Sequence, residues 1–474
     1  MLFPTFTFVV FFLIVWPINW ITMVRPHRWR IFITLASYIF YAAWDWRFAL
    51  LLAGSTIINQ GFAVAMHRTS DQQRRTALLV ATVVVNLGIL AYFKYWNFFA
   101  DSGQAVLGNL GFEVPSLLVH TVLPVGISFF TFMALSYVID IYRGDQKPTT
   151  FAKFTVFLSF FPHLVAGPIV RPAELVPQFE PPPDPRRIDT TRAFALIAGG
   201  LFKKVVIATA LADFVDPVFG APNQYSSLVV LIAIYAYAIQ IYADFSGYTD
   251  MAIGIALLLG FKLPQNFDRP YSSASLREFW RRWHMTLSRW LRDYLYIPLG
   301  GNRKGRTRTY INIMLTMLLG GLWHGASWTF VIWGALNGLG LVVDHWWVSR
   351  RSERGGREPA TSGPRRWGMI FLTFNFVCLA WVFFRQDSLG GATNLLSHLF
   401  TNWGQPSPQI TIGVILAIAA LMVTQFTPPS VGQRLRGLFS GFSALGQGAC
   451  LGVVLMVINL LGPYGVAPFI YFQF

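Results

Sequence analysis

Long apolar runs recur along the whole chain and are separated by short charged or polar turns. The runs at 5–24, 77–99 and 367–384 are examples, and each approaches the roughly 20 apolar residues that an α-helix needs to cross a bilayer. In lipid, only helices and closed barrels satisfy all of their backbone hydrogen bonds. The pattern predicts an all-α, polytopic integral membrane protein with about 11 transmembrane or re-entrant helices, together with interfacial helices.

The composition excludes several other classes of protein. Hydrophobic residues make up 54% of the 474 residues and charged residues only 12%, about half the usual share of a soluble domain. A soluble globular enzyme, a disordered chain and a disulfide-rich secreted domain are therefore ruled out. The two cysteines, Cys378 and Cys450, lie in apolar runs without the spacing of metal ligands, so no metal site is predicted.

The charged residues indicate the topology. The chain has 37 Lys and Arg residues against 21 Asp and Glu residues, a net charge of +16. Cytoplasmic loops of membrane proteins gather Lys and Arg, so we assign this excess to such loops and to membrane lipid rather than to nucleic acid. Arg25, Arg28 and Arg30 follow the first run, which predicts an N-terminus outside the cytoplasm. That run has no basic start and no small-residue cleavage site, so we expect a retained helix.

Two segments in the middle of the chain do not read as simple spans. Residues 154–170 are apolar, but Pro162 and Gly167 interrupt them and both flanks are basic, which predicts a re-entrant segment. Residues 194–212 carry the adjacent Lys203 and Lys204 at their centre. Because a lysine at the bilayer centre is costly, we expect this pair to reach an interface or an internal cavity.

A single histidine, His324, lies at membrane depth among glycines and tryptophans of the segment 320–328. The surrounding run, 310–347, has basic residues at both ends, so it must form two crossings or a deep hairpin with His324 near the turn or in a funnel. A histidine can accept and return a proton near neutral pH, and the glycines leave room for a substrate. The alternative is a buried histidine that only joins two helices by a hydrogen bond. Membrane depth favours the functional interpretation.

Residues 279–296 predict one continuous amphipathic helix at the membrane interface. Trp280, Trp283 and Trp290 share one face of this helix. Basic side chains occupy its other faces and the turn that follows: Arg281, Arg282, Arg289, Arg303 and Lys304. They fit either an anchor on anionic lipid or a basic site that holds a phosphate-rich cofactor. His284, inside this helix, is either a second active-site group or a structural residue.

Two carboxylates, Asp244 and Asp250, interrupt the apolar run 227–259, with Tyr248 between them. They could line an internal cavity or cap a break in a helix. The sequence contains no phosphate-binding loop, no nucleophile elbow and no zinc-protease motif, so it predicts neither nucleotide hydrolysis nor metal catalysis.

Five segments of the chain carry a family resemblance. They follow one another at residues 125–130, 162–172, 242–250, 283–303 and 321–325. The longest begins Trp-His-Met-Thr-Leu-Ser-Arg-Trp-Leu-Arg-Asp-Tyr, and the last reads Gly-Leu-Trp-His-Gly. Together they resemble the membrane-bound O-acyltransferase family, specifically its bacterial alginate O-acetyltransferase branch.

This resemblance implies a function and a set of site residues. By this resemblance the two family histidines correspond to His324 and His284, and His324 would be the essential catalytic residue. Acetyl-CoA would donate its acetyl group from the cytoplasmic side of the inner membrane, and no cofactor would be bound permanently. An exported polysaccharide, or a periplasmic acetyltransferase partner, would receive the group through a central funnel. Trp323, Asp244, Asp250 and Tyr248 are then expected to line this tunnel, and the basic residues above to hold the phosphates of the donor.

The predicted domain organisation is one membrane domain over residues 1–474. It comprises N-terminal helices in 1–150, a catalytic core in 151–348 and C-terminal helices in 349–474. Within the family, acetylation of cellulose or peptidoglycan and D-alanyl transfer remain alternatives. Outside the family, the alternatives are a proton-coupled transporter and a scaffold that only anchors a periplasmic enzyme.

Overall fold

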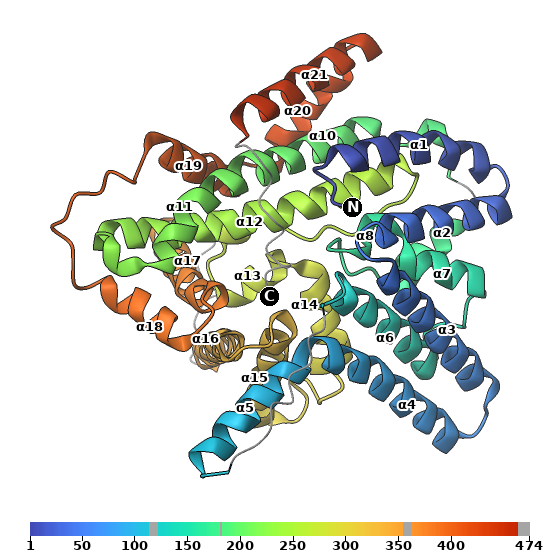
Figure 1. The fold of residues 1–474 in the computed structure, drawn as a ribbon, viewed down its shortest axis with the longest axis horizontal. Helices are drawn as coiled ribbons and strands as arrows, with labels where there is room; N and C mark the ends of the chain where they lie inside the picture. The colour runs from blue at the N-terminus through green and yellow to red at the C-terminus, as the bar shows by residue number, and fades with distance from the viewer. Residues whose placement is uncertain (113–121, 181–182, 354–361, 463–474) are drawn as a thin grey trace. The chain divides into compact units, whose positions relative to one another are not determined.

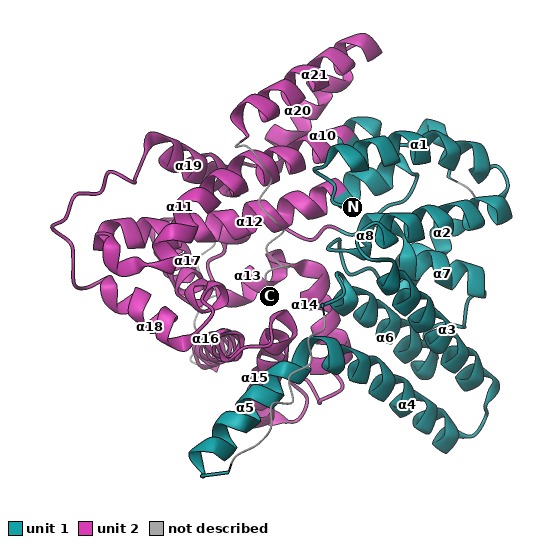
Figure 2. Cartoon of the chain, viewed as in Figure 1, with its two compact units in different colours: residues 1–193, 252–264 teal, residues 194–251, 265–474 magenta. Residues whose placement is uncertain are grey.

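The computed structural model describes residues 1–474 apart from 113–121, 181–182, 354–361 and 463–474 (Figure 1). Every regular element among the described residues is helical, which confirms the all-α prediction. The chain divides into two units (Figure 2). Unit 1 comprises Met1–Ala193 and Ala252–Pro264, and unit 2 comprises Phe194–Met251 and Gln265–Phe474.

Unit 1 contains the N-terminal helices. They are α1 (Phe6–Met23), α2 (Pro26–Ala42), α3 (Trp46–Arg68), α4 (Gln72–Leu90), the π-helical η1 (Ala91–Tyr95), α5 (Trp96–Asn109), α6 (Ile127–Arg143), α7 (Phe151–Ser159), α8 (Phe161–Leu164) and α9 (Pro172–Leu175). Helix α10 (Thr190–Leu201) begins in unit 1 and ends in unit 2.

Unit 2 contains the remaining long helices. They are the π-helical η4 (Phe202–Ala208), α11 (Thr209–Gly220), α12 (Ser227–Leu258, whose last turns belong to unit 1), α13 (Leu276–Arg282), α14 (Met285–Leu291), the π-helical η7 (Arg292–Tyr296), α15 (Gly305–His324), α16 (Trp328–Glu353), α17 (Pro364–Arg385), α18 (Leu389–His398), α19 (Ile412–Phe426), α20 (Pro429–Ser440) and α21 (Ala444–Leu461).

Seven helices of the described chain are long and apolar enough to cross a membrane, or eight if the pair α19 and α20, bent by 100°, counts as one span. The chain is therefore a multi-pass membrane protein, as predicted. The expected number of about 11 also included shorter and re-entrant segments. One of these is 154–170, where the helix does break: α7 ends at Ser159 and the short α8 follows.

Tryptophan side chains complete the hydrogen bonding where α12 ends in unit 1. The indole N–H groups of Trp16 and Trp20 both donate to the carbonyl of Leu258, at 2.9 and 3.1 Å. The side-chain amide of Asn19 donates to the next carbonyl, that of Leu259, at 3.2 Å. The last carbonyls of a helix have no partner within the helix, so these three donors from α1 satisfy groups that lipid could not.

The structure corrects two local predictions in unit 2. The polar segment 242–250 neither breaks nor caps α12, which continues as one helix. The segment 279–296 is not one helix, because α13 ends at Arg282 and α14 begins at Met285. Trp283, expected on a face at the membrane interface, is only 1% exposed.

Candidate active site

The candidate site is built around the hairpin of α15 and α16, which pack along each other. Two glycines permit this close approach. A Cβ atom on Gly321 would collide with the backbone carbonyl of Phe330, and one on Gly334 would collide with that of Met317. The hairpin predicted for 310–347 is therefore confirmed, and His324 is the last residue of α15, beside the turn.

His324 is buried among aromatic rings and is 4% exposed. Its ring centroid lies 5.0 Å from that of Trp333 and 5.2 Å from that of Phe384, both edge to face. The adjacent Trp323 contacts it at 4.9 Å. These rings leave the imidazole few orientations, and they exclude bulk water from much of its surface.

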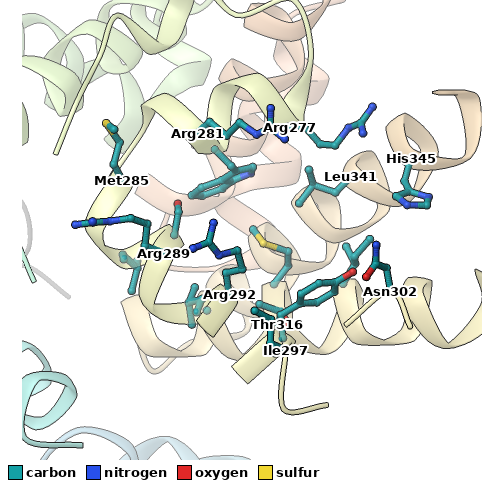
Figure 3. Close-up of a pocket in the computed structure, with 18 of the residues that line it drawn as sticks. Arg277, Arg281, Met285, Arg289, Arg292, Ile297, Asn302, Thr316, Leu341 and His345 are labelled. Atoms are coloured by element: carbon teal, nitrogen blue, oxygen red, sulfur yellow. The ribbon is translucent and has the colours of Figure 1, made fainter. Parts of the chain in front are cut away.

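Unit 2 contains a cavity of about 690 Å³ (Figure 3). His324 is one of the residues that line it. Its size is in the range of small-molecule binding sites. Helix α15 contributes a stripe of residues at helical spacing: Ile313, Thr316, Met317, Gly320 and His324. Helix α16 contributes Trp333, Leu341 and His345. With 1.5 Å of rise per residue, Trp333 and His345 are about 18 Å apart along α16, so the cavity is elongated.

Four arginines line this cavity: Arg277, Arg281, Arg289 and Arg292. Figure 3 shows them spread along the cavity, with Arg289 near one end and Arg277 near His345 at the other. Arg277 is held there by Asp344, which accepts hydrogen bonds from its backbone N–H and its Nε, both at 3.2 Å. The walls near these arginines attract anionic groups such as phosphates.

The structure places two of the five predicted cofactor-binding residues, Arg281 and Arg289, in the cavity wall. The other three, Arg282, Arg303 and Lys304, do not line it. Arg282 instead forms an ion pair with Glu278 at 2.7 Å.

Two lining residues, Arg277 and His345, were not among those predicted from the sequence. The spacing of Arg277 to Arg281, four residues along one helix, was a usable signal for Arg277. His345 had no such signal, because its place depends on the packing of α16 against α13.

His284 does not line the cavity. It sits at the break between α13 and α14 in the left-handed backbone region, with φ 42° and ψ 53°. Backbone hydrogen bonds on both sides hold this break: Asp268 N–H donates to the Arg282 carbonyl, and Met285 N–H donates to the Asn266 carbonyl, each at 2.9 Å. The histidine is fully buried, and this burial lowers its pKa to about 3.

The hydrogen bonding of His284 fixes its tautomer. Its Nδ1 lies 3.2 Å from Oδ1 of Asn266, which also accepts from the backbone N–H and the hydroxyl of Thr286. Because a backbone N–H can only donate, this amide oxygen is the acceptor, and Nδ1 of the neutral histidine carries the proton. Trp323 contacts both histidines, since its ring lies 6.2 Å from that of His284.

The residues predicted to line a substrate tunnel do not line this cavity. Asp244 forms an ion pair with Lys204, and Asp250 one with Lys203, at 2.5 Å. The side chains of Lys203 and Lys204 are only 15% and 2% exposed. These buried ion pairs are consistent with the prediction that the two lysines avoid lipid. Tyr248 is buried, 1% exposed, on the same helix as the carboxylates.

Comparison with known proteins assigns the chain to a family. The model of the membrane-bound O-acyltransferase family matches residues 119–383. The probable alginate O-acetylase AlgI of Pseudomonas aeruginosa is 43% identical over 381 residues, which cover 79% of this chain and 70% of that protein. Its counterpart in Pseudomonas putida is 42% identical over 419 residues, 86% of this chain and 82% of that protein. The peptidoglycan O-acetyltransferase of Helicobacter pylori is 38% identical over 397 residues, 78% of this chain and 73% of that protein.

The chain therefore belongs to the membrane-bound O-acyltransferase family. It is an O-acyltransferase and a multi-pass membrane protein. Among the relatives compared, those most similar to it are alginate O-acetylases.

Proposed function

We propose that this enzyme transfers an acetyl group from acetyl-CoA to a hydroxyl of an exported, alginate-like polysaccharide, or to a periplasmic partner that completes the transfer. The observation that carries the proposal is one elongated cavity with His324 near apolar residues and four arginines along its walls. An acyl thioester with a phosphate-rich carrier combines an apolar acyl group with anionic phosphates, so it suits a cavity lined by both apolar and basic side chains.

His324 acts as the general base in this proposal. It removes the proton of the acceptor hydroxyl, whose oxygen attacks the thioester carbonyl. The new ester C–O bond forms, the C–S bond breaks, and the proton passes from the imidazole to the departing thiolate. The aromatic rings around His324 keep water away from the reacting carbonyl, which limits hydrolysis of the donor.

The tetrahedral oxyanion requires a hydrogen-bond donor. His284 is not suited to this role, because it is neutral and its only N–H points to Asn266. We assign the role to an indole or backbone N–H beside His324, and we assign His284 to positioning Trp323, which contacts both rings.

Arg277, Arg281, Arg289 and Arg292 would bind the phosphates of the donor. The resemblance of the chain to alginate O-acetylases supports the choice of acceptor and a place in the bacterial inner membrane. Acetylation of peptidoglycan or cellulose, and D-alanyl transfer, are the competing assignments, and they differ in the donor or the acceptor rather than in the role of His324.

The deciding experiment compares wild type with His324→Ala. The purified protein in lipid nanodiscs receives radiolabelled acetyl-CoA, and release of coenzyme A is measured with and without alginate oligosaccharides. In parallel, both forms are expressed in an alginate-producing strain that lacks its own acetylase, and the O-acetyl content of the polymer is measured. We expect His324→Ala to lose transfer by at least about a hundredfold. His27→Ala, a change at an exposed histidine, is the control and should keep it.

Full activity of His324→Ala would overturn the assignment of the base. If acetyl-CoA is turned over with peptidoglycan fragments or cello-oligosaccharides but not with alginate, the acceptor is one of those polymers instead of alginate. Failure of wild type to turn over acetyl-CoA in either assay would reject the donor.

A further inference from the structure

The cavity that reaches His324 is lined by both charged and apolar side chains. The four arginines are spread along its walls, as described above, and His345 lies at one end with Arg277. The apolar part of its lining includes Leu287, Leu291, Met317, Gly320 and Trp333. All five of these residues are buried. The two leucines, Met317 and Trp333 are between 1% and 9% exposed. The ring of Trp333 lies 5.0 Å from that of His324.

Gly320 and Leu291 face each other within this apolar part. Gly320 precedes His324 by four residues, so it lies on the same face of α15 and about 6 Å away along the helix axis. A Cβ atom on Gly320 would lie 3.3 Å from Cδ1 of Leu291, closer than most such contacts allow. The side chain of Leu291 therefore occupies the space that opens over Gly320, next to the proposed base.

We infer that Leu291 and Gly320 together determine the length of the acyl group that the enzyme transfers, and that they select acetyl over longer chains. This inference rests on the proposed function, since it assumes an acyl thioester whose carbonyl lies at His324. An acyl group extending past the imidazole meets Leu287, Leu291, Met317 and Trp333. An acetyl methyl group needs little room there, whereas each further methylene must displace one of these side chains from a packed wall.

The size of the effect follows from the behaviour of apolar pockets. One methylene more or less changes kcat/KM by roughly 10- to 200-fold in such a pocket. Leu291→Ala removes the side chain that fills the space over Gly320, so it should admit longer acyl groups. Gly320→Ala has the opposite effect, because Leu291 must move by a few tenths of an ångström toward the space that the acyl group uses.

The test measures kcat/KM for acetyl-, propionyl- and butyryl-CoA with the full-length protein in nanodiscs, as acceptor-dependent release of coenzyme A. We expect wild type to prefer acetyl-CoA. The butyryl-to-acetyl ratio should rise at least about tenfold in Leu291→Ala and fall below the wild-type ratio in Gly320→Ala. Leu341→Ala is the matched control. Leu341 also lines the cavity, but it lies about 12 Å along α16 from Trp333, so its replacement should leave this ratio unchanged.

Each outcome decides a separate question. A ratio in Leu291→Ala within twofold of wild type, with acetyl transfer retained, overturns the inference while the proposed function stands. A ratio that rises equally in Leu341→Ala also overturns it, since the effect would not be local. If Leu291→Ala does not fold, Leu291→Val, which removes one methylene, takes its place. The propionyl-to-acetyl ratio of kcat/KM should then rise above the wild-type ratio. Failure of wild type with all three thioesters rejects the proposed function itself.

Discussion

Lys204 and Asp244 form an ion pair inside unit 2 in which the two side chains are only 2% and 5% exposed. Lys204 comes from the π-helical η4 and Asp244 from the middle of α12. The residue after Asp244 is Phe245, whose ring meets that of His284 edge to face at 4.7 Å. The ion pair therefore fixes a helix that packs directly against one of the two family histidines.

Removal of one partner of this pair should be strongly destabilising. Lys204→Met leaves the Asp244 carboxylate buried without its counter-charge, at an expected cost of about 3–5 kcal/mol. Replacement of both partners, Lys204→Met with Asp244→Leu, should recover most of that loss because no buried charge remains. Unfolding in detergent with increasing denaturant measures both. The exposed pair Arg74–Asp71 is the control, and Arg74→Ala should cost less than about 1 kcal/mol. Equal stability of wild type and Lys204→Met would contradict the argument.

Two adjacent glycines before η4 should respond very differently to substitution. A Cβ atom on Gly200 would lie 2.6 Å from the carbonyl oxygen of Gly247 on α12, whereas one on Gly199 meets nothing within 4 Å. Gly200→Ala should therefore separate the helices that carry the ion pairs and lower the melting temperature by several degrees. Gly199→Ala should keep the wild-type value or exceed it slightly, since alanine favours a helix. Thermal unfolding of the two variants side by side is the measurement, and equal melting temperatures would show that the helices do not approach closely.

The positions of the spanning helices were predictable from the sequence because apolar runs follow directly from the cost of burying backbone in lipid. The expected spans 5–24 and 367–384 correspond to α1 (Phe6–Met23) and α17 (Pro364–Arg385). The location of His324 at a hairpin turn followed from the basic residues at both ends of its run. These features depend only on local composition, which a single sequence contains.

The arrangement around His284 was not predictable in the same way. The residues 279–296 have the periodicity of one helix, yet the chain turns into a left-handed conformation at His284. Asn266, 18 residues earlier in the chain, stabilises this break through its backbone carbonyl and its side-chain oxygen. Likewise, Lys204 and Asp244 are 40 residues apart, and nothing local pairs them. Tertiary contacts overrode local propensity at both places.

The hairpin that places His324 should tolerate one glycine substitution but not another. Gly321→Ala puts a Cβ atom against the carbonyl of Phe330, which cannot move without separating α15 from α16. We expect a loss of acyl transfer of more than about tenfold, because an active-site displacement of even 1 Å has large effects. Gly338→Ala on α16 meets chiefly the flexible end of Met314, at 2.7 Å, so it should retain most of the activity. The measurement is the acceptor-dependent release of coenzyme A, and an active Gly321→Ala variant would show that the hairpin can open without harm.

His284 should make the stability of the protein sensitive to acid. Burial lowers its pKa in the folded protein to about 3, whereas an exposed histidine titrates near 6.5. Above about pH 6.5 neither state binds the proton, so this residue adds no pH dependence there. Between about pH 6.5 and 3 only the unfolded chain binds it, so stability should fall by up to about 1.4 kcal/mol per pH unit.

His284→Asn isolates this effect. Asparagine tolerates the left-handed backbone at this position, and its side-chain amide can still donate a hydrogen bond to Asn266. Unlike histidine, asparagine does not titrate. The free energy of unfolding is measured in detergent from pH 7.5 to 4.5 for wild type and for His284→Asn. It should fall more steeply with decreasing pH in wild type than in the variant. The difference between the two pH slopes is the quantity that decides. Parallel slopes would mean that His284 is protonated in the folded protein as readily as in the unfolded chain, and that its imidazole is not sealed from water.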